Sequence, residues 1–281
     1  MFIKANAKIN VFLDVVSSRE DQYHNLDMVM LPIELHDMIE IEKLPSTRDT
    51  YVVCDHVELK ETKYNLIMTT INVMKEKYGI KDNFDVKVHK EIPICAGLGG
   101  GSSNAAATIK ALNSMYKLNM SLDEMINIGK TIGADIPFCL TNSPARVTGI
   151  GENIRRIKLH HGYDVLIVKP DEGLSTKKMF ALADEQGVEH SNGDEVENAL
   201  VFGNDTKLSE CVFNSLEKIA ISQIPEIEKI KNMLKNDGFK IVLMSGSGSA
   251  VFALTTDHKK ARTMFKKYDK QGFNTYLTRT L

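Results

Sequence analysis

The chain has 281 residues, of which 43% are hydrophobic and 26% are charged. This is the composition of a folded globular protein, and the length is enough for one large domain or for two domains that share a cleft. The formal net charge of −2 gives no overall basic field that would attract nucleic acid or anionic lipid, although it is compatible with a local anion site.

Three features argue against a secreted or membrane-spanning protein. Residues 92–109 form the longest uncharged stretch, but glycine, serine and asparagine interrupt it, so it could not cross a bilayer as an apolar helix. The N-terminus alternates polar and apolar residues, unlike a signal peptide. The cysteines are far apart in the sequence and form no CxxC pair: Cys54, Cys95, Cys139 and Cys211. We therefore expect a cytoplasmic protein with reduced cysteines and no metal centre of its own.

Strand and helix patterns alternate in the first half of the chain. Residues 2–15 place apolar and polar side chains in turn, which predicts a strand with one buried face. Residues 65–78 carry apolar side chains at helical spacing and Gly79 follows them, which predicts a helix that ends there. Further short strands are predicted at 38–42, 51–58 and 84–88.

The second half also mixes helices with strands. Ser121 followed by Glu124 is a capping box, so a helix is expected from 122 to 132. The polar and acidic stretch 184–194 is expected to be a solvated loop. The other expected elements are helices at 104–116, 208–221, 226–236 and near the C-terminus, and strands at 163–168, 240–244 and 250–254. The predicted fold class is α+β, with two domains, 1–155 and 156–281.

Glycines dominate the segment PICAGLGGGSSNAAA at residues 93–107, which follows a predicted strand and opens a predicted helix. Glycine permits positive φ angles and lets backbone N–H groups approach an anion closely. The first turn of the helix adds unpaired N–H groups and the positive end of its dipole. These features indicate a nest for a polyphosphate, formed by Pro93, Ile94, Cys95, Ala96, Gly97, Leu98, Gly99, Gly100, Gly101, Ser102 and Ser103.

Other glycine-rich loops fit this segment less well. No GK[ST] follows, as a Walker A loop requires, and the third glycine of a dinucleotide fingerprint is replaced by Ser102. The HRD and DFG triplets of protein kinases are absent. A plain glycine turn between a strand and a helix is the remaining alternative.

Six further segments, together with this loop, resemble the GHMP kinase superfamily. They are ANAKINVFL at 5–13, YHNL at 23–26, YNLI at 64–67, GADIPF at 133–138, FGND at 202–205 and SGSGSAVF at 245–252. The resemblance extends along the whole chain. It implies an N-terminal S5-domain-2-like α/β domain, a C-terminal ferredoxin-like domain and an active site in the cleft. The branch it resembles most uses ATP and Mg2+ to phosphorylate the 2-hydroxyl of 4-diphosphocytidyl-2-C-methyl-D-erythritol, in the non-mevalonate isoprenoid pathway.

The resemblance implies two catalytic residues. Asp135 matches the aspartate that takes the hydroxyl proton, and a cap at the start of a helix is its alternative or additional role. Lys8 matches the lysine that stabilises the charge of the reacting groups, where pattern alone would favour a solvated lysine at a sheet edge.

Substrate recognition is also carried over from the family. Tyr23 and His24 match the pair that binds the cytidine base, but Gln22 replaces the usual glycine before them. Phe180 matches the second aromatic residue of the base pocket, and a core role is its alternative. The remaining assignments are Asn65 beside the adenine, with the N-cap of the helix that follows as its alternative, and Asn10, Thr176 and Gly246 in the substrate site. We expect a small-molecule substrate, no nucleic-acid or membrane partner, and a monomer or homodimer. Another GHMP kinase substrate, or ATP binding without catalysis, remains open.

Overall fold

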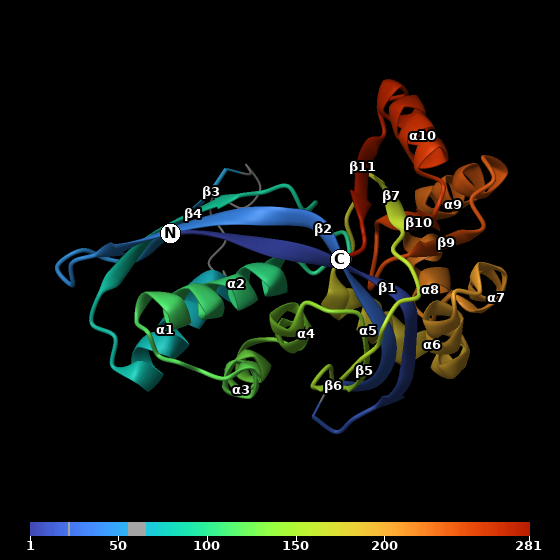
Figure 1. Ribbon diagram of the computed structural model, residues 1–281. Helices are drawn as coiled ribbons and strands as arrows, with labels where there is room; N and C mark the ends of the chain where they lie inside the picture. The colour runs from blue at the N-terminus through green and yellow to red at the C-terminus, as the bar shows by residue number, and fades with distance from the viewer. Residues whose placement is uncertain (22, 56–65) are drawn as a thin grey trace. The chain divides into compact units, whose positions relative to one another are not determined.

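The computed structural model describes residues 1–21, 23–55 and 66–281 (Figure 1). The chain forms two compact units. Unit 1 comprises Met1–Ala7, Leu35–Ile92 and Gly99–Asn142, and unit 2 comprises Lys8–Glu34, Pro93–Leu98 and Ser143–Leu281. The long strands β1 (Phe2–Ser18) and β2 (His24–Leu44) each contribute residues to both units. The predicted boundary after residue 155 divides the sequence into the two domains expected from the family, which are not the same as these compact units. That boundary stays a prediction.

Unit 1 packs helices against one face of a sheet, as Figure 1 shows. The C-terminal part of β2 pairs antiparallel with β4 (Asn83–His89), and β3 (Tyr51–Cys54) pairs parallel with β4. Ile39 lies opposite Val88 and both are buried, so alternation along the strands directs one apolar face to the core. Helices α1 (Leu66–Tyr78) and α2 (Gly100–Met115) lie against this face, and α3 (Leu122–Ile132) and α4 (Ile136–Thr141) pack against these helices in the same core.

Local sequence signals set the ends of α3. The Oγ of Ser121 accepts the Glu124 N–H at 3.2 Å, and the Glu124 carboxylate accepts the Ser121 N–H at 2.7 Å. Gly133 follows the last residue of the helix, and its N–H donates to the carbonyl of Gly129 at 3.0 Å. The predicted capping box and helix are therefore confirmed.

The C-terminal part of unit 2 is a four-stranded antiparallel sheet. Its spatial order is β11 (Asn274–Arg279), β7 (Asp164–Lys169), β10 (Val251–Thr255) and β9 (Ile241–Met244). Helices α9 (Glu226–Asn236) and α10 (His258–Lys270) connect and pack against these strands. A βαββαβ succession in this order is the ferredoxin-like arrangement, which confirms the prediction for the C-terminal domain.

Shorter elements complete unit 2. Residues Leu26–Met30 of β2 pair antiparallel with β5, and Phe12 and Leu13 of β1 pair parallel with β8. The remaining elements are β5 (Ala145–Gly149), β6 (Asn153–Arg156), β8 (Phe213–Asn214), α5 (Thr176–Gln186), α6 (Gly193–Phe202), α7 (Asp205–Cys211) and α8 (Glu217–Gln223).

Two predicted elements differ in the structure. The helix expected at 208–221 is two helices, α7 and α8, with β8 between them, because the backbone of Phe213 and Asn214 pairs with β1. The strand β1 is buried on both faces from Ala7 to Val15 rather than on one, since packing covers its polar face as well. Long-range contacts decide both outcomes.

Two boundaries also differ. Helix α2 begins at Gly100, four residues before the predicted start, so its first turn contains the end of the glycine segment. The loop predicted at 184–194 is shorter, because α5 continues to Gln186 and α6 begins at Gly193. The final strand β11 was not predicted, and it is held by pairing with β7.

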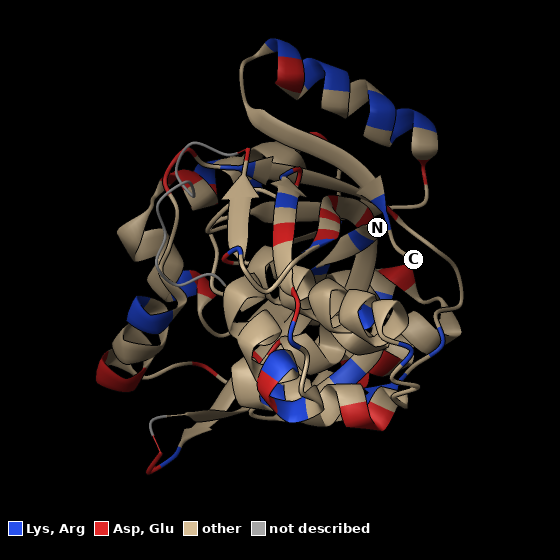
Figure 2. Ribbon diagram, turned by 90° about the vertical axis from the view of Figure 1, so that its left-hand side faces the viewer, with Lys and Arg blue, Asp and Glu red and all other residues tan. Residues whose placement is uncertain are grey.

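Positive charge is concentrated on α10, as Figure 2 shows at the top of the view. Two of its lysines contact the segment between α9 and β9: the Lys267 ammonium lies 2.7 Å from Asp237, and that of Lys260 lies over the Phe239 ring. The near-neutral net charge therefore includes a locally basic helix. No helix in the described ranges is long and apolar enough to cross a membrane.

Candidate active site

The glycine segment has the backbone that the sequence predicts. Gly97 and Gly99 both have φ of 72°, and Gly99 is the residue that precedes the first turn of α2. The N-terminal N–H groups of a helix have no partner within the helix, and they carry the positive end of its dipole. No acidic residue occupies the first turn of α2. The start of this helix is therefore suited to an anion.

Lys8 is a buried lysine on β1, with 4% of the residue exposed. Its ammonium donates to the side-chain oxygen of Asn10 at 2.6 Å and to the carbonyl oxygen of Gly97 at 2.8 Å. Burial of an ammonium group is costly unless it has such partners. The alternative of a solvated lysine at a sheet edge is therefore wrong, and Lys8 lies against the first half of the glycine segment.

The second glycine turn, residues 245–249, binds the same half of that segment. Ser245 Oγ donates to the Gly97 carbonyl at 3.0 Å, and the N–H of Ser249 donates to the Cys95 carbonyl at 3.2 Å. A Cβ atom on Gly246 would lie 2.8 Å from the Gly97 oxygen and 3.1 Å from Lys8 Nζ. Only glycine permits this close approach of backbone to backbone and to the ammonium.

Asp135 lies in unit 1 at the residue before α4, and it is half-buried. Its side chain makes no capping hydrogen bond to the helix. The capping role that sequence alone suggests is therefore not the one that this carboxylate performs here.

The two serines of the glycine segment have different environments. Ser103 is 2% exposed, its Oγ donates to the Asn6 carbonyl at 2.5 Å, and its N–H donates to the carbonyl of Gly99 at 2.8 Å. Ser102 is half-buried in the first turn of α2. The hydroxyl proton and N–H of Ser103 thus serve the packing of unit 1.

His24 and Phe180 lie together in unit 2, although they are far apart in the sequence. Their rings stack with centroids 4.8 Å apart, and His24 Nε2 lies 2.9 Å from Asp184 Oδ1. The Ser18 hydroxyl, which donates to Asp184, and then His24 lower the pKa of that carboxyl. Asp184 was not predicted. Its spacing of four residues from Phe180 on one helix was the available signal, because such residues share a helix face.

The other predicted site residues have varied surroundings. Tyr23 is 53% exposed beside His24 in the chain, whereas Asn10 is fully buried. The hydroxyls of Thr176 and Ser247 lie 2.8 Å apart, which links the start of α5 to the second glycine turn. The predicted adenine contact Asn65 and the departure from the family at Gln22 lie outside the described residues.

The FGND segment has a structural role. Asn204 caps α7 by accepting the Lys207 N–H at 3.0 Å. Asp205 accepts the Tyr163 hydroxyl at 2.7 Å, and burial together with this bond raises the pKa of Tyr163. This segment therefore joins α7 to the start of β7.

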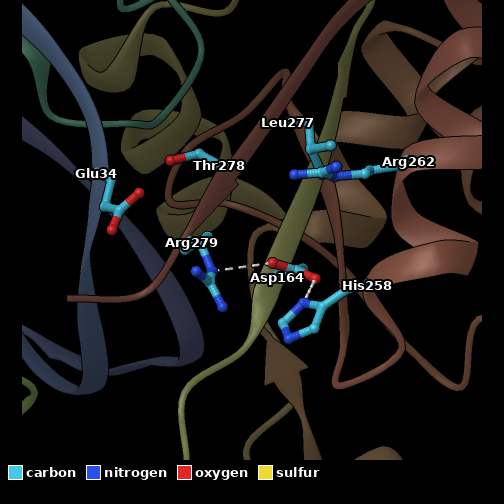
Figure 3. Close-up of a pocket in the computed structure, with 7 residues that line it drawn as sticks. All are labelled: Glu34, Asp164, His258, Arg262, Leu277, Thr278 and Arg279. Carbon is cyan, nitrogen blue, oxygen red and sulfur yellow. Dashed lines mark hydrogen bonds and ion pairs between the residues drawn. The ribbon is translucent and has the colours of Figure 1, made fainter.

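A separate hollow of about 520 Å³ lies at the edge of the C-terminal sheet (Figure 3). Figure 3 shows His258 and Arg279 pointing toward Asp164, and Arg279 Nε lies 3.2 Å from Asp164 Oδ1. The buried carboxylate thus already has two basic partners. None of the residues that line the hollow is one of the predicted site residues: Glu34, Asp164, His258, Arg262, Leu277, Thr278 and Arg279.

Both parts of the chain match models of one kinase class. Residues 65–143 match the GHMP kinases N terminal domain, and residues 188–274 match the GHMP kinases C terminal domain. The fold and the glycine segment thus define an ATP-dependent small-molecule kinase of the GHMP class.

Full-length relatives narrow the class to one family. The 4-diphosphocytidyl-2-C-methyl-D-erythritol kinase of Clostridium kluyveri is 36% identical over 282 residues, with 100% of each chain covered. That of Caldicellulosiruptor saccharolyticus is also 36% identical, with 96% of this chain and 94% of the relative covered. A crystal structure of 4-(cytidine 5'-diphospho)-2C-methyl-D-erythritol kinase has a TM-score of 0.81 at 28% identity, with 100% of this chain and 99% of that chain covered. The chain belongs to the 4-diphosphocytidyl-2-C-methyl-D-erythritol kinase family of the GHMP kinases.

Proposed function

We propose that the protein transfers the γ-phosphate of ATP to the 2-hydroxyl of 4-diphosphocytidyl-2-C-methyl-D-erythritol, producing the 2-phosphate and ADP. The observation that carries this proposal is the buried Lys8 ammonium, bound to the carbonyl of Gly97 in the glycine segment. The full-length relatives carry the name of this reaction's enzyme. The contact between His24 and Phe180 supports a site for a flat base.

In the proposed mechanism, the hydroxyl oxygen attacks the γ-phosphorus as the bond from that phosphorus to the β–γ bridging oxygen breaks. Asp135 takes the proton of the hydroxyl, and ADP leaves with the bridging oxygen. Lys8 stabilises the negative charge on the reacting oxygens, because a fixed ammonium stabilises such charge more strongly in a site that excludes water than it does in water. Lys8 belongs to unit 2 and Asp135 to unit 1.

The glycine segment would hold the triphosphate. The N-terminal N–H groups of α2 and the open backbone around Gly97 and Gly99 provide donors without acidic side chains in that first helical turn. Such contacts position the γ-phosphate, and phosphoryl transfer depends mainly on positioning and on charge stabilisation.

We propose that Mg2+ accompanies ATP. This ion takes oxygen ligands, and in kinases it is held largely by phosphate oxygens. The half-buried Ser102 hydroxyl in the first turn of α2 fits such an ion as an oxygen donor. Bound Mg2+ supplies positive charge that screens the triphosphate.

We further propose that the enzyme acts in the cytoplasm as a monomer or homodimer, without a nucleic-acid partner.

ADP release with Mg-ATP and the cytidine substrate tests the proposed function. We expect turnover by the parent enzyme and a loss of kcat of about 10²- to 10⁴-fold in Asp135→Asn, since loss of a general base has effects of this size. The matched control is Asp123→Asn, which changes an exposed aspartate at the start of α3. Its kcat is expected to stay within about twofold of the parent, as for most surface substitutions.

Three results would contradict the proposal. Parent-like turnover by Asp135→Asn would remove this residue from the mechanism. Turnover of homoserine or mevalonate, with the cytidine substrate left unchanged, would assign the enzyme another substrate. Binding of ATP by calorimetry with no acceptor consumed would favour a protein that binds ATP without catalysis.

A further inference from the structure

Two largely buried side chains hold the end of β9 where the second glycine turn begins. The Asn214 amide donates to the Met244 carbonyl at 2.9 Å and to the Gly246 carbonyl at 2.8 Å. The Glu217 carboxylate accepts the Met244 N–H at 2.8 Å. Both backbone groups of Met244 are thus bound by side chains, although β9 also pairs with β10 at this residue.

The chemistry of position 214 is specific for an asparagine. Asn214 is 5% exposed, and its amide nitrogen serves two carbonyl oxygens while its oxygen accepts the Leu216 N–H at 3.0 Å. An aspartate has the same shape but no N–H group, so it would direct negative charge at two carbonyls. The side chain therefore acts as a two-donor clamp.

The clamp is joined to the strand that carries Lys8. Asn214 ends β8, which pairs parallel with β1 with Leu13 opposite Asn214. The N–H of Ser215 donates to the Leu13 carbonyl at 2.9 Å. Movement of β8 is therefore restricted by β1, and the clamp transmits that position to the glycine turn.

The second glycine turn also contacts the glycine segment. Ser245 Oγ lies 3.0 Å from the Gly97 oxygen, and the Ala250 N–H donates to the Ala96 carbonyl at 3.3 Å. The ammonium of Lys8 binds the same Gly97 oxygen at 2.8 Å. A shift of the turn would therefore move both Gly97 and the environment of Lys8.

We infer that Asn214 and Glu217 are positioning residues for phosphoryl transfer, which act by fixing the turn 245–249 against Gly97 and Lys8. The expected effect of these residues on kcat rests on the proposed function. Their expected effect on the turn 245–249 does not depend on any substrate. Glu217 is itself oriented by an ion pair with Lys231 on α9, and both side chains are largely buried.

The test compares Asn214→Ala and Asn214→Asp with Asn192→Ala. Asn192 caps α6 by accepting the Asp194 N–H at 2.9 Å, so its loss also removes an asparagine hydrogen bond but leaves the turn untouched. Assays are run well below the melting temperature of each folded variant. We expect kcat to fall about tenfold or more in both Asn214 variants, since small misplacements of reacting groups have large rate effects. Asn192→Ala is expected to keep kcat within about twofold.

A double-mutant cycle tests whether Asn214 acts through the turn. Ser245→Ala removes the hydroxyl that binds Gly97. If both residues fix one turn, adding Asn214→Ala to Ser245→Ala lowers kcat by less than Asn214→Ala does in the parent, because coupled residues are not additive. Full additivity would overturn the inference.

Hydrogen exchange provides the readout that needs no substrate. Asn214→Ala is expected to speed exchange of the amides in residues 244–250, and Asn192→Ala is expected to leave them unchanged. If the parent enzyme does not phosphorylate the cytidine substrate, the proposed function fails, but faster exchange in Asn214→Ala alone still supports the clamp. Exchange at the turn equal to that of Asn192→Ala overturns it, as does parent-like kcat.

Discussion

Two buried polar residues of unit 2, Lys8 and Asn10, lie side by side on β1 and depend on hydrogen-bond partners. Asn10 is fully buried and Lys8 nearly so, on a strand whose other residues are mostly apolar. Each has a partner, because an unpaired buried ammonium or amide would lower the free energy of unfolding. The ammonium, in turn, depends on the Gly97 carbonyl, so the position of one lysine also depends on the backbone of the glycine segment.

Phe180 offers a test of substrate binding at the scale of one residue. We expect Phe180→Ala to raise KM for the cytidine substrate by about 10- to 100-fold, because a base stacked on an aromatic ring is worth about 1–3 kcal/mol. The variant also removes the ring that stacks on His24. KM for ATP is expected to change by less than about twofold. Steady-state kinetics with each substrate varied in turn measure both values.

The control for this prediction is Phe202→Ala. Phe202 ends α6 and is 74% exposed, so its truncation removes an aromatic ring without removing a contact to His24. Equal kinetics for the two variants would show that Phe180 does not contribute to substrate binding and would favour a packing role.

Among the secondary-structure elements, those with strong local signals were predicted best. The capping box of α3 and the apolar spacing of α9 act within one helix, and both helices have the predicted ends. By contrast, β8 and β11 exist because of pairing with β1 and β7, which lie far away in the sequence. No pattern within a short window contains that information.

At the candidate active site too, sequence patterns predicted the local backbone but not the contacts between distant segments. The glycine segment and its helix were predictable, because positive φ angles require glycine at Gly97 and Gly99. The contact of His24 with Phe180, and the bond to Asp184, depend on the path of the chain through unit 2. The clamp of Asn214 and the bond from Met244 to Glu217 were missed for the same reason, since their partners belong to β9 and the turn after it.

The glycine segment makes a prediction at the scale of the element. A Cβ atom on Gly97 would lie 1.9 Å from the Ser245 carbonyl oxygen, in addition to the strain of φ +72°. Gly79 has a similar φ of +63°, but a Cβ atom added there would meet nothing within 4 Å. We expect Gly79→Ala to lower the free energy of unfolding by about 1–2 kcal/mol, the cost of a left-handed residue. Gly97→Ala should cost about 1–3 kcal/mol more, because it also overpacks the turn.

Urea denaturation of the two alanine variants measures this difference. Gly79 follows α1 in unit 1, so Gly79→Ala isolates the cost of the backbone angle from the cost of the contact. Equal losses for the two variants would mean that the backbone near Gly97 moves away from Ser245 without cost. The close approach of the glycine segment to the second glycine turn would then not be needed for stability.

At the scale of the whole molecule, charged networks join elements that are distant in the chain. Arg146 on β5 lies 2.6 Å from Asp27 on β2, and Arg155 on β6 lies 2.5 Å from Glu197 on α6. Arg146 also lies 3.5 Å from Glu197. Glu197 thus connects α6 to both β5 and β6, which pair antiparallel as a hairpin, and its side chain is only 14% exposed.

This network predicts how stability depends on pH. The hydrogen bond from Arg155, followed by the charges of Arg155 and Arg146, lowers the pKa of Glu197 against the opposing effect of burial. A carboxyl whose pKa is lowered on folding stabilises the protein above its unfolded value of about 4.3, and this contribution is lost as pH falls through the folded pKa. We therefore expect Glu197→Gln to lower the free energy of unfolding at pH 7 by about 1–2 kcal/mol, as for a hydrogen bond to a charged group.

The difference between Glu197→Gln and the parent should then shrink as pH falls below about 4, because the parent carboxyl also becomes neutral. Urea denaturation across this pH range measures both free energies. The matched control is Glu195→Gln on the same helix, whose partner Lys207 lies 2.8 Å away in a pair with both side chains nearly half exposed. An exposed pair contributes about 0–1 kcal/mol, so this control should change little at any pH. A pH-independent loss in Glu197→Gln would mean that packing of the side chain, rather than its charge, joins α6 to the hairpin.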